Sequence, residues 1–122
     1  IVAFPVRERH AGKKMKDITS IAIEVVMKSG DGRVKIDEAL DALASGDLTK
    51  AETLLKEAND LVVQAHNAQT EVIQSQVSGE SMEYSLLFIH AQDTLMTINT
   101  ELRMAKKLLP IVKMLLAKKE AE

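Results

Sequence analysis

The stretch ALASGDLTKAE, residues 42 to 52, contains the turn that decides the fold. Gly46 can adopt the left-handed conformation that closes a helix, and the side chain of Asp47 can cap the helix that follows. On both sides of this turn, apolar and small residues recur at alternating steps of three and four, which is the spacing of one helix face. The stretch therefore predicts two helices joined by the short turn SGD, residues 45 to 47.

The first predicted helix begins at about Ile18 and ends at this turn. Its apolar or small positions are 18, 22, 25, 29, 32, 36, 40 and 43. Their phase survives the segment SGDGR, residues 29 to 33. We therefore expect the helix to run through Gly30 and Gly32, with a local weakness there.

Two further helices are predicted after the SGD turn. The second runs from Leu48 to about Gln76, and the third runs from about Met82 to Leu109, with the glycine-containing turn VSGES, residues 77 to 81, between them. Pro110 cannot donate a backbone hydrogen bond and disfavours a helical residue before it. The tail IVKMLLAKK after Pro110 is expected as either a kinked continuation or a separate last turn or two.

Connections this short make neighbouring helices antiparallel, so we predict an all-α fold, an up-down-up three-helix bundle. A chain of 122 residues is long enough for one domain with its own core. Apolar residues lie on more than one side of the third helix, which exceeds what two partner helices can cover. We therefore expect the chain to self-associate.

The composition argues against several classes of site and partner. The chain has no cysteine, which removes disulfides and thiolate chemistry and is compatible with a reducing compartment. No apolar run approaches the roughly 18 residues of a membrane span, and no basic patch interleaved with aromatic residues favours nucleic-acid binding. We expect a cytoplasmic protein with no direct membrane insertion and no nucleic-acid partner.

Residues 1 to 14 form a leader without helical or strand periodicity. The leader is basic although the formal charge of the whole chain is -2, so the remainder is acidic. Its charged residues are Arg7, Arg9, Lys13 and Lys14 against Glu8. We expect this leader to be a non-native or disordered segment ahead of a domain that spans residues 15 to 122.

The segment FIHAQDTLM, residues 88 to 96, puts a histidine inside an otherwise apolar part of the third helix. At 100° per residue, five polar residues share one stripe of that helix with apolar neighbours. The polar members are His90, Asp93, Thr94, Thr97 and Glu101, and the apolar neighbours are Leu86, Met104 and Leu108. Such a mixed stripe indicates a buried or interfacial polar patch rather than a solvated face.

Three interpretations of His90 are open from the residues alone. It can be a structural histidine that is hydrogen-bonded to Asp93 or to a threonine. It can share a metal ion with Asp93, although one such pair is only half of a ligand set. It can be a nucleophile, because a neutral imidazole accepts a phosphoryl group on one nitrogen while a hydrogen bond to the other fixes its orientation.

A second internal histidine lies in QAHNAQT, residues 64 to 70, where His66, Gln69 and Thr70 can share one helix face. On its own, this cluster is typical of a structural or solvent-facing polar group. It is of interest because the second helix must pass beside the third.

Several segments, taken in order, resemble the lactose/cellobiose-type enzyme IIA component of the bacterial sugar phosphotransferase system, over about residues 15 to 109. They are KSGDGR, ALASGDLTKAE, EANDLVVQAHNAQT, SGE and YSLLFIHAQDTLMT. Each segment alone is weak evidence for this family, whereas the whole set in this order is specific for it. The resemblance implies three long helices per subunit and assembly as a homotrimer.

The resemblance also implies roles for particular residues. His90, the histidine of the HAQD motif, would accept a phosphoryl group from phospho-HPr and pass it to a cysteine of the cognate enzyme IIB. Asp93 would lie near the trimer axis, where three copies hold a divalent cation in a structural role, with Mg²⁺ the expected ion. Any role of Gln92 would be across a subunit boundary, and His66 would help to shape the site without being phosphorylated.

One position departs from the pattern of the family. Family members commonly read HAQDHLM, whereas this chain has Thr94 in place of the second histidine. Threonine keeps a hydrogen-bond donor and acceptor but loses an ionisable ring, so proton handling or orientation near His90 can differ. We expect phosphotransfer to survive because the nucleophile remains. The alternative is a non-catalytic helical interaction or regulatory module that retains the fold.

Overall fold

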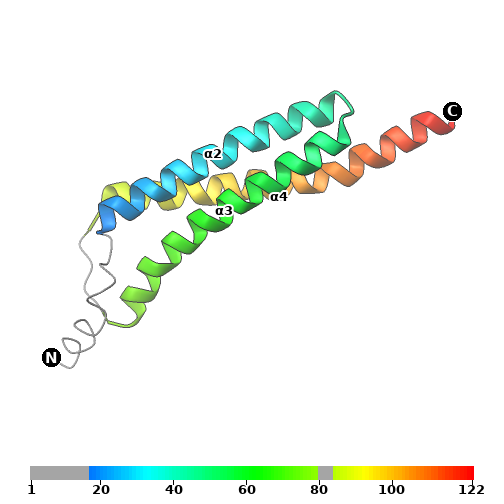
Figure 1. Cartoon of the computed structure of the whole chain (residues 1–122). Coiled ribbons are helices and arrows are strands. Elements are labelled where there is room, and N and C mark those ends of the chain that lie inside the picture. Colours follow the sequence, from blue (N-terminus) through cyan, green and yellow to red (C-terminus); the bar gives the residue numbers. More distant parts are fainter. Residues whose placement is uncertain (1–16, 80–83) are drawn as a thin grey trace.

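The computed structural model describes residues 17–79 and 84–122, and within these residues it contains three helices and no strand. Helix α2 spans Ile18–Ala44, α3 spans Leu48–Val77 and α4 spans Leu86–Ala121. Helices α2 and α4 run in one direction and α3 runs in the other (Figure 1), so the predicted all-α, up-down-up bundle is confirmed. None of these helices is long and apolar enough to cross a membrane. The leader, residues 1 to 14, lies outside the described residues.

Side-chain caps and one glycine set the limits of α2 and α3. The carboxylate of Asp17 accepts a hydrogen bond from the backbone N–H of Ser20 at 2.7 Å and begins α2. At the other end, Gly46 has a φ of 80°, the left-handed conformation that glycine adopts without steric cost. Asp47 then accepts a hydrogen bond from the N–H of Lys50 at 3.1 Å and begins α3. The predicted turn is confirmed.

Helix α4 begins later than predicted. It starts at Leu86 rather than at about Met82, because Ser85 is extended and its hydroxyl accepts a hydrogen bond from the N–H of Phe88 at 3.1 Å. Serine satisfies a free N–H of the first turn, so the helix begins where this cap is available. Met82 itself lies outside the described residues.

Pro110 lies inside α4, and the helix continues past it to Ala121. Two outcomes were expected for the residues after Pro110, and the structure shows that they continue the helix. Leu109 and Val112 pack against the small cluster of Ala42, Leu43 and Ala51 at the turn between α2 and α3. These apolar contacts offset the backbone hydrogen bond that proline cannot make. Beyond them, α4 extends past the turn (Figure 1).

The core lies where the three helices meet, and it is built mainly from aliphatic side chains. The largest fully buried aliphatic residues are Val25, Ile36, Leu95, Ile98 and Leu102. Gly32 lets α2 approach α3 closely, because a Cβ atom added to it would lie 3.4 Å from Cγ2 of Val62. Helices α2 and α3 therefore pack closely against each other within one chain.

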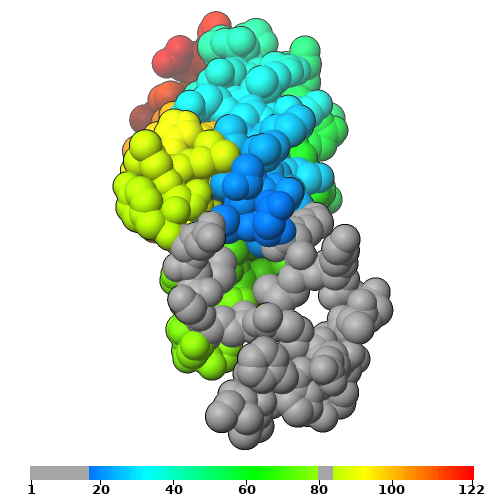
Figure 2. Space-filling view, turned by 90° about the vertical axis from the view of Figure 1, so that its left-hand side faces the viewer, coloured from blue at the N-terminus to red at the C-terminus, as the bar shows by residue number. Residues whose placement is uncertain are grey.

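The contact between α3 and α4 is less complete. The two helices diverge toward the end of α3 in Figure 1, and Figure 2 shows the starts of α2 and α4 side by side with the end of α3 set apart from them. Val63, Ile73 and Val77 remain exposed along this part of α3. The chain thus leaves apolar surface uncovered where α3 and α4 separate.

Candidate functional site

His90 lies near the start of α4, and its side chain is exposed. In the part of the chain that the structure describes, its imidazole ring forms no hydrogen bond. The hydroxyl of Thr94 donates instead to the backbone carbonyl oxygen of His90, at 2.8 Å. Among the described residues of one chain, His90 therefore lacks the ring hydrogen bond that a structural histidine would have, and its ring is exposed.

An ion pair identifies the side of α4 on which His90 lies. Nε and Nη2 of Arg33, on α2, donate to the two carboxylate oxygens of Glu101 at 3.0 and 3.1 Å. Glu101 follows His90 by three helical turns, so the two side chains leave α4 within about 20° of each other and about 16 Å apart along its axis. Because α2 and α4 run in parallel, the same step back along α2 leads from Arg33 to Ala22. His90 therefore faces outward on the α2 side of α4, level with Ala22.

Asp93 belongs to what we call the outer face of α4, the side of that helix turned away from α2 and α3. The apolar side chains of this face are between 41% and 68% exposed, and they are Leu86, Ile89, Met104 and Ile111. Asp93 is an exposed carboxylate among them. The predicted mixed stripe is therefore present, but a single chain does not bury it.

Three threonines at intervals of three follow His90 on α4. The hydroxyls of Thr94, Thr97 and Thr100 donate to the carbonyl oxygens of the residues four positions earlier, at 2.8, 2.8 and 3.1 Å. This bonding within the helix commits each hydroxyl proton and tends to bend a helix. Thr94 can therefore accept a hydrogen bond from a group at His90 but has no free proton to donate to it.

His66 lies on the other side of α4. It lines a cavity of about 260 Å³ between α3 and α4, together with Asn59, Val62, Val63, Leu95, Met96 and Asn99. His90 is not among these residues, and Asn99 leaves α4 about 180° away from it. Within one chain, the two internal histidines therefore belong to opposite sides of α4.

The polar residues expected to share a helix face with His66 differ in how far the structure buries them. Gln69 is only 7% exposed, and its Oε1 has no hydrogen-bond partner among the described residues. Thr70 is half-buried and donates to the carbonyl oxygen of His66 at 2.8 Å, while the His66 side chain is exposed. The core positions Ala65 and Val72 flank Gln69 at helical spacing, and this spacing was the signal in the sequence for its burial.

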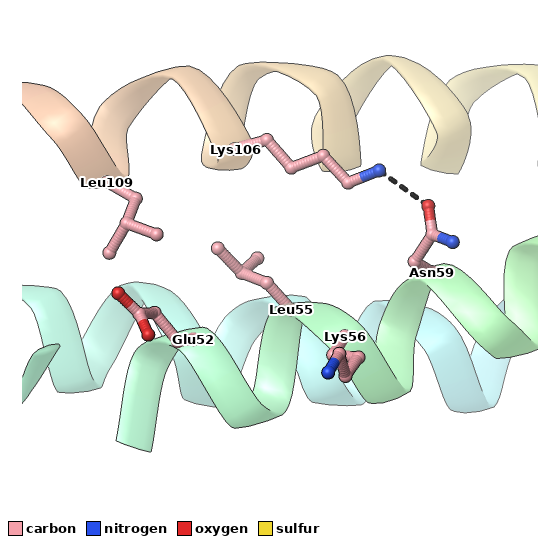
Figure 3. A pocket seen from close by; sticks show the side chains of 6 residues that line it. All are labelled: Glu52, Leu55, Lys56, Asn59, Lys106 and Leu109. Carbon is pink, nitrogen blue, oxygen red and sulfur yellow. Dashed lines mark hydrogen bonds between the residues drawn. The ribbon is translucent and has the colours of Figure 1, made fainter. Parts of the chain in front are cut away.

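A second cavity, of about 300 Å³, lies farther along the contact between α3 and α4 (Figure 3). Its lining residues are Glu52, Leu55, Lys56, Asn59, Lys106 and Leu109. The ammonium group of Lys106 donates to Oδ1 of Asn59 at 2.5 Å and links the two helices at one end of it. No residue of the His90–Asp93 segment lines this cavity, so we assign it no part in the chemistry of His90.

A single copy of the described chain does not bring together enough ligands for a metal ion. Within residues 17–79 and 84–122, no three His, Cys, Asp or Glu residues lie close enough to share one. Asp93 offers at most two oxygens, whereas Mg²⁺ takes six ligands in octahedral geometry. An ion at Asp93 would therefore take its other ligands from water or from other copies of the chain.

The sequence matches one protein family across most of its length. Residues 20–113, which include His90 and Asp93, match the family described as PTS system, Lactose/Cellobiose specific IIA subunit. The lactose-specific EIIA component of Lactococcus lactis subsp. lactis is 40% identical over 82 residues, which cover 67% of this chain and 78% of that protein. The lactose-specific EIIA component of Staphylococcus epidermidis is 41% identical over 81 residues, which cover 66% and 78%.

Solved structures share the arrangement of helices. The cellobiose-specific enzyme IIA from Bacillus anthracis superposes with a TM-score of 0.78 at 34% identity, over 88% of this chain and 99% of that one. PtcA from S. mutans gives a TM-score of 0.76 at 37% identity, over 78% and 93%. The IIA(Chitobiose) of Escherichia coli, solved in complex with HPr, has the same fold at 23% identity, with a TM-score of 0.68 over 83% and 98%.

Proposed function

The chain belongs to the lactose/cellobiose-specific IIA family of the sugar phosphotransferase system, and we propose that it is a cytoplasmic phosphocarrier of that system. His90 accepts a phosphoryl group from phospho-HPr and passes it to a cysteine of the cognate enzyme IIB during uptake of a lactose- or cellobiose-type sugar. The observation that carries this proposal is the exposed imidazole of His90, free of hydrogen bonds within the described chain, on a long regular helix. HPr as the donor is supported by the E. coli IIA(Chitobiose), which was solved in complex with HPr.

The chemistry consists of two displacements at one phosphorus atom. In the first, a ring nitrogen of His90 forms a bond to phosphorus while the phosphorus–nitrogen bond of the HPr phosphohistidine breaks. In the second, the thiolate of enzyme IIB attacks the same phosphorus, and His90 leaves with the bonding electron pair. A neutral imidazole needs no general base for the first step. Helix α4 holds the ring on a rigid backbone, which favours in-line approach of each partner.

We propose that three copies assemble into a ring through the outer face of α4. The exposed apolar side chains of this face run along the whole helix, and the divergence of α3 leaves Val63, Ile73 and Val77 uncovered beside it. A contact between the outer face of one α4 and the open groove between α3 and α4 of the next copy would bury both surfaces. Repeated three times, such a head-to-tail contact closes a homotrimer.

Supporting roles at the phosphoryl group are proposed for residues that His90 does not meet within its own chain. Gln92 leaves α4 about 160° away from His90, and His66 lies in the groove between α3 and α4. In a ring, these side chains belong to the surface that the next copy's His90 approaches. Gln92 is proposed to donate its amide N–H to a phosphoryl oxygen, and His66 to shape the site without being phosphorylated. Thr94 is proposed to act on its own His90, as an acceptor only.

Asp93 is proposed to hold a divalent cation, with Mg²⁺ the expected ion, together with its two symmetry mates. Its carboxylate forms no ion pair among the described residues and stands among apolar side chains that the proposed ring would bury. Three carboxylates brought together without a cation would repel one another. An oxygen-ligated hard cation supplies the compensating charge, and its role is structural.

The phosphocarrier proposal is tested by incubating the chain with enzyme I, HPr and phosphoenolpyruvate and measuring its intact mass. We expect one added phosphoryl group on the wild type and none on His90→Ala. His66→Ala is the matched control, since it removes the other imidazole of the described helices and should still be phosphorylated. An unmodified wild type, or a phosphorylated His90→Ala, would reject the assignment.

The trimer and its cation are tested by analytical ultracentrifugation and thermal unfolding with and without EDTA. We expect a trimeric mass, a stability that falls when divalent ions are removed, and loss of that ion dependence in Asp93→Leu. Thr53→Leu, an exposed substitution on α3, is the control that should leave the ion dependence intact. The axial-site proposal fails if neither EDTA nor Asp93→Leu changes the stability of the trimer.

A non-catalytic interaction or regulatory module with the same fold is the alternative function. The specific observation in its favour is Thr94, whose hydroxyl proton is committed to the backbone of His90 and offers no ionisable group. A pull-down with enzyme IIB, compared between the phosphorylated and unphosphorylated chain, separates the two functions. A carrier hands its phosphoryl group to IIB, whereas a binding module would be captured without losing or gaining one.

A further inference from the structure

The face of α4 that carries Asp93 continues along the helix with a repeat of seven residues. From Asp93 onward, steps of four and three residues alternate, which is the spacing at which parallel helices pack around a common axis. The positions after Asp93 are Thr97, Thr100, Met104, Lys107, Ile111, Met114 and Lys118, and we call them the seam of α4. All of them are exposed in the single chain. In the proposed ring, which brings Asp93 and its symmetry mates together, these positions approach the same three-fold axis.

Lys107 interrupts the apolar half of this seam. Met104 precedes it by about 4.5 Å along the helix and is 61% exposed, and Ile111 follows it by about 6 Å and is 47% exposed. Asp93 lies about 21 Å before Lys107 on the same helix. This separation is more than twice the screening length at physiological salt, about 8 Å, so Asp93 does not neutralise the ammonium group of Lys107.

Lys107 also lacks a partner of opposite charge within the described chain. Its side chain forms no ion pair or hydrogen bond there. No acidic residue lies three or four positions from it on α4, where Arg103, Met104, Pro110 and Ile111 stand. Five other basic side chains of α2 and α4 do reach acceptors on a neighbouring helix, and they are Lys28, Arg33, Lys35, Lys106 and Lys113.

Lys118, the other basic residue of the seam, has different surroundings. It lies in the last turn of α4, where a positive charge is favourable, and four positions before the acidic Glu122. Lys107 lies instead in the interior of the helix, between apolar residues of the seam. Of the two lysines, Lys107 is therefore the one whose charge the chain leaves without compensation.

The symmetry of the ring determines what Lys107 requires. Three copies of its ammonium group reach the axis at one level, where three like charges repel one another and a buried charge must be paired. We propose that Lys107 and its two symmetry mates bind one small inorganic anion on the three-fold axis of the ring. This inference rests on the proposed homotrimer and goes beyond it by adding a second ion, of opposite charge to the cation at Asp93.

The surroundings of the lysines limit the anion to a small one. The side chains of Met104 and Ile111 close the space above and below, and each ammonium group can donate a hydrogen bond toward the axis. Chloride accepts such bonds from three sides and leaves no polar atom without a partner. Phosphate compensates more charge and has three oxygens around its own three-fold axis, but its fourth oxygen would point at an apolar layer. The two anions are therefore compared directly.

The presence of a lysine in an apolar seam has a further physical reason. A single polar layer in a bundle of parallel helices lowers its stability but fixes the number and register of the helices. An anion that binds the assembled lysines recovers part of that stability, because it binds the trimer and not the separate chains. The anion concentration then regulates how tightly the ring is assembled.

Sedimentation equilibrium tests the anion site, at constant Mg²⁺ and ionic strength, with gluconate exchanged for chloride or for phosphate. We expect the dissociation constant of the wild-type trimer to fall about tenfold when the effective anion is present at ten times its own Kd. Lys107→Met should abolish this response and form a tighter trimer than the wild type in gluconate, because three methionines extend the apolar seam. Lys107→Gln, a second neutral variant, should also lack the response.

Lys50→Met is the matched control. Lys50 is an exposed lysine of α3, two helical turns before Glu57, which pairs with Lys35 of α2, so it lies away from the seam of α4. This variant should keep the wild-type response to the anion. A general effect of salt on association would appear in Lys107→Met as well.

Three outcomes would overturn the anion site. An equal response in the wild type and Lys107→Met would show that the anion acts elsewhere. A wild-type trimer that responds to neither anion would show that Lys107 is neutralised by a carboxylate of the next copy or by solvent, and it would leave the ring intact. A wild type that sediments as a monomer would remove the ring and the anion site together, while phosphorylation of His90 is still measured separately.

Discussion

The two sides of α2 differ in how completely the chain covers them. On the inner side, Gly32 lies against Val62, Ile36 is fully buried, and the basic side chains reach partners on α3 and α4. On the outer side, Gly30 faces open space, and Met27 and its apolar neighbours are exposed. The same helix therefore contains residues that the fold explains and residues that it does not.

This difference indicates where to look for function in a small helical bundle. A glycine inside a helix lowers the stability of that helix. It indicates a functional role only when no contact within the chain explains why it is a glycine. Gly32 lies against α3, where an added Cβ would be in van der Waals contact with Val62, whereas an added Cβ at Gly30 would contact nothing within the described chain. Four substitutions in and beside α2 test whether its two sides differ in this way.

The largest effect is expected for Ile36→Ala, on the inner side. Ile36 is 1% exposed, so the substitution removes buried methylene and methyl groups and leaves a cavity. We expect a loss of about 2–5 kcal/mol in the free energy of unfolding, measured by urea denaturation. Val34→Ala on the outer side is the control, and a loss of similar size there would mean that the outer side is covered after all.

Gly32→Val should have the next largest effect. The added Cβ would sit at the limit of normal contact with Val62, and the two γ carbons of valine would extend into α3. Such overpacking costs about 1–3 kcal/mol. The midpoint of urea unfolding measures it, and an unchanged midpoint would show that α2 and α3 can separate locally without cost.

Gly30→Ala should act in the opposite direction. Because a Cβ at this position meets nothing within 4 Å, the exchange should stabilise the chain by about 0.5–1 kcal/mol through the better helix propensity of alanine. Thermal unfolding followed by circular dichroism measures the gain. A destabilised variant would contradict the open surroundings of Gly30.

The smallest effect concerns the cap that begins α2 and so serves both of its sides. Hydrogen bonds from the backbone N–H and the hydroxyl of Ser20 lower the pKa of Asp17 below its ordinary value of 3.8. A carboxyl group with a lowered pKa stabilises the fold at pH values above 3.8, and this contribution is lost as the pH falls through the lower, folded-state pKa.

Asp17→Asn keeps a capping oxygen without the titration. The difference in thermal midpoint between wild type and Asp17→Asn should therefore shrink when the pH is lowered from 7 to about 2. A difference that stays constant over this range would show that the charge of Asp17 has no part in the cap.

Much of the fold could be read from the sequence because local chemistry determines it. Gly46 and Asp47 stop one helix and begin the next through their own backbone and side-chain preferences, and both were predicted. The start of α4 was predicted four residues too early, because the apolar pattern does not reveal that Ser85 supplies the cap. Pro110 left two outcomes open, and packing of Val112 at the distant turn between α2 and α3 decided between them.

The site was less accessible to sequence reasoning because it depends on contacts between helices. Helical spacing correctly put His90 and Glu101 on the same side of α4, but it could not reveal that Arg33, 68 residues before Glu101, orients that side toward α2. Nor could it predict that the hydroxyl of Thr94 bonds the backbone of His90 rather than a ring. The roles of His90 and Asp93 follow from family resemblance, and they stay predictions until the phosphorylation and metal experiments are done.

The parallel course of α2 and α4 has a practical consequence for handling the protein. The start of α2 lies at the same end of the bundle as the start of α4, close to His90, as Figure 2 shows for the two helices. The last residue, Glu122, lies at the far end, about 48 Å from His90 along α4. Immobilisation at Glu122 therefore leaves the histidine accessible to large partners, whereas attachment at Asp17 itself puts the support at the same end of the bundle as the histidine.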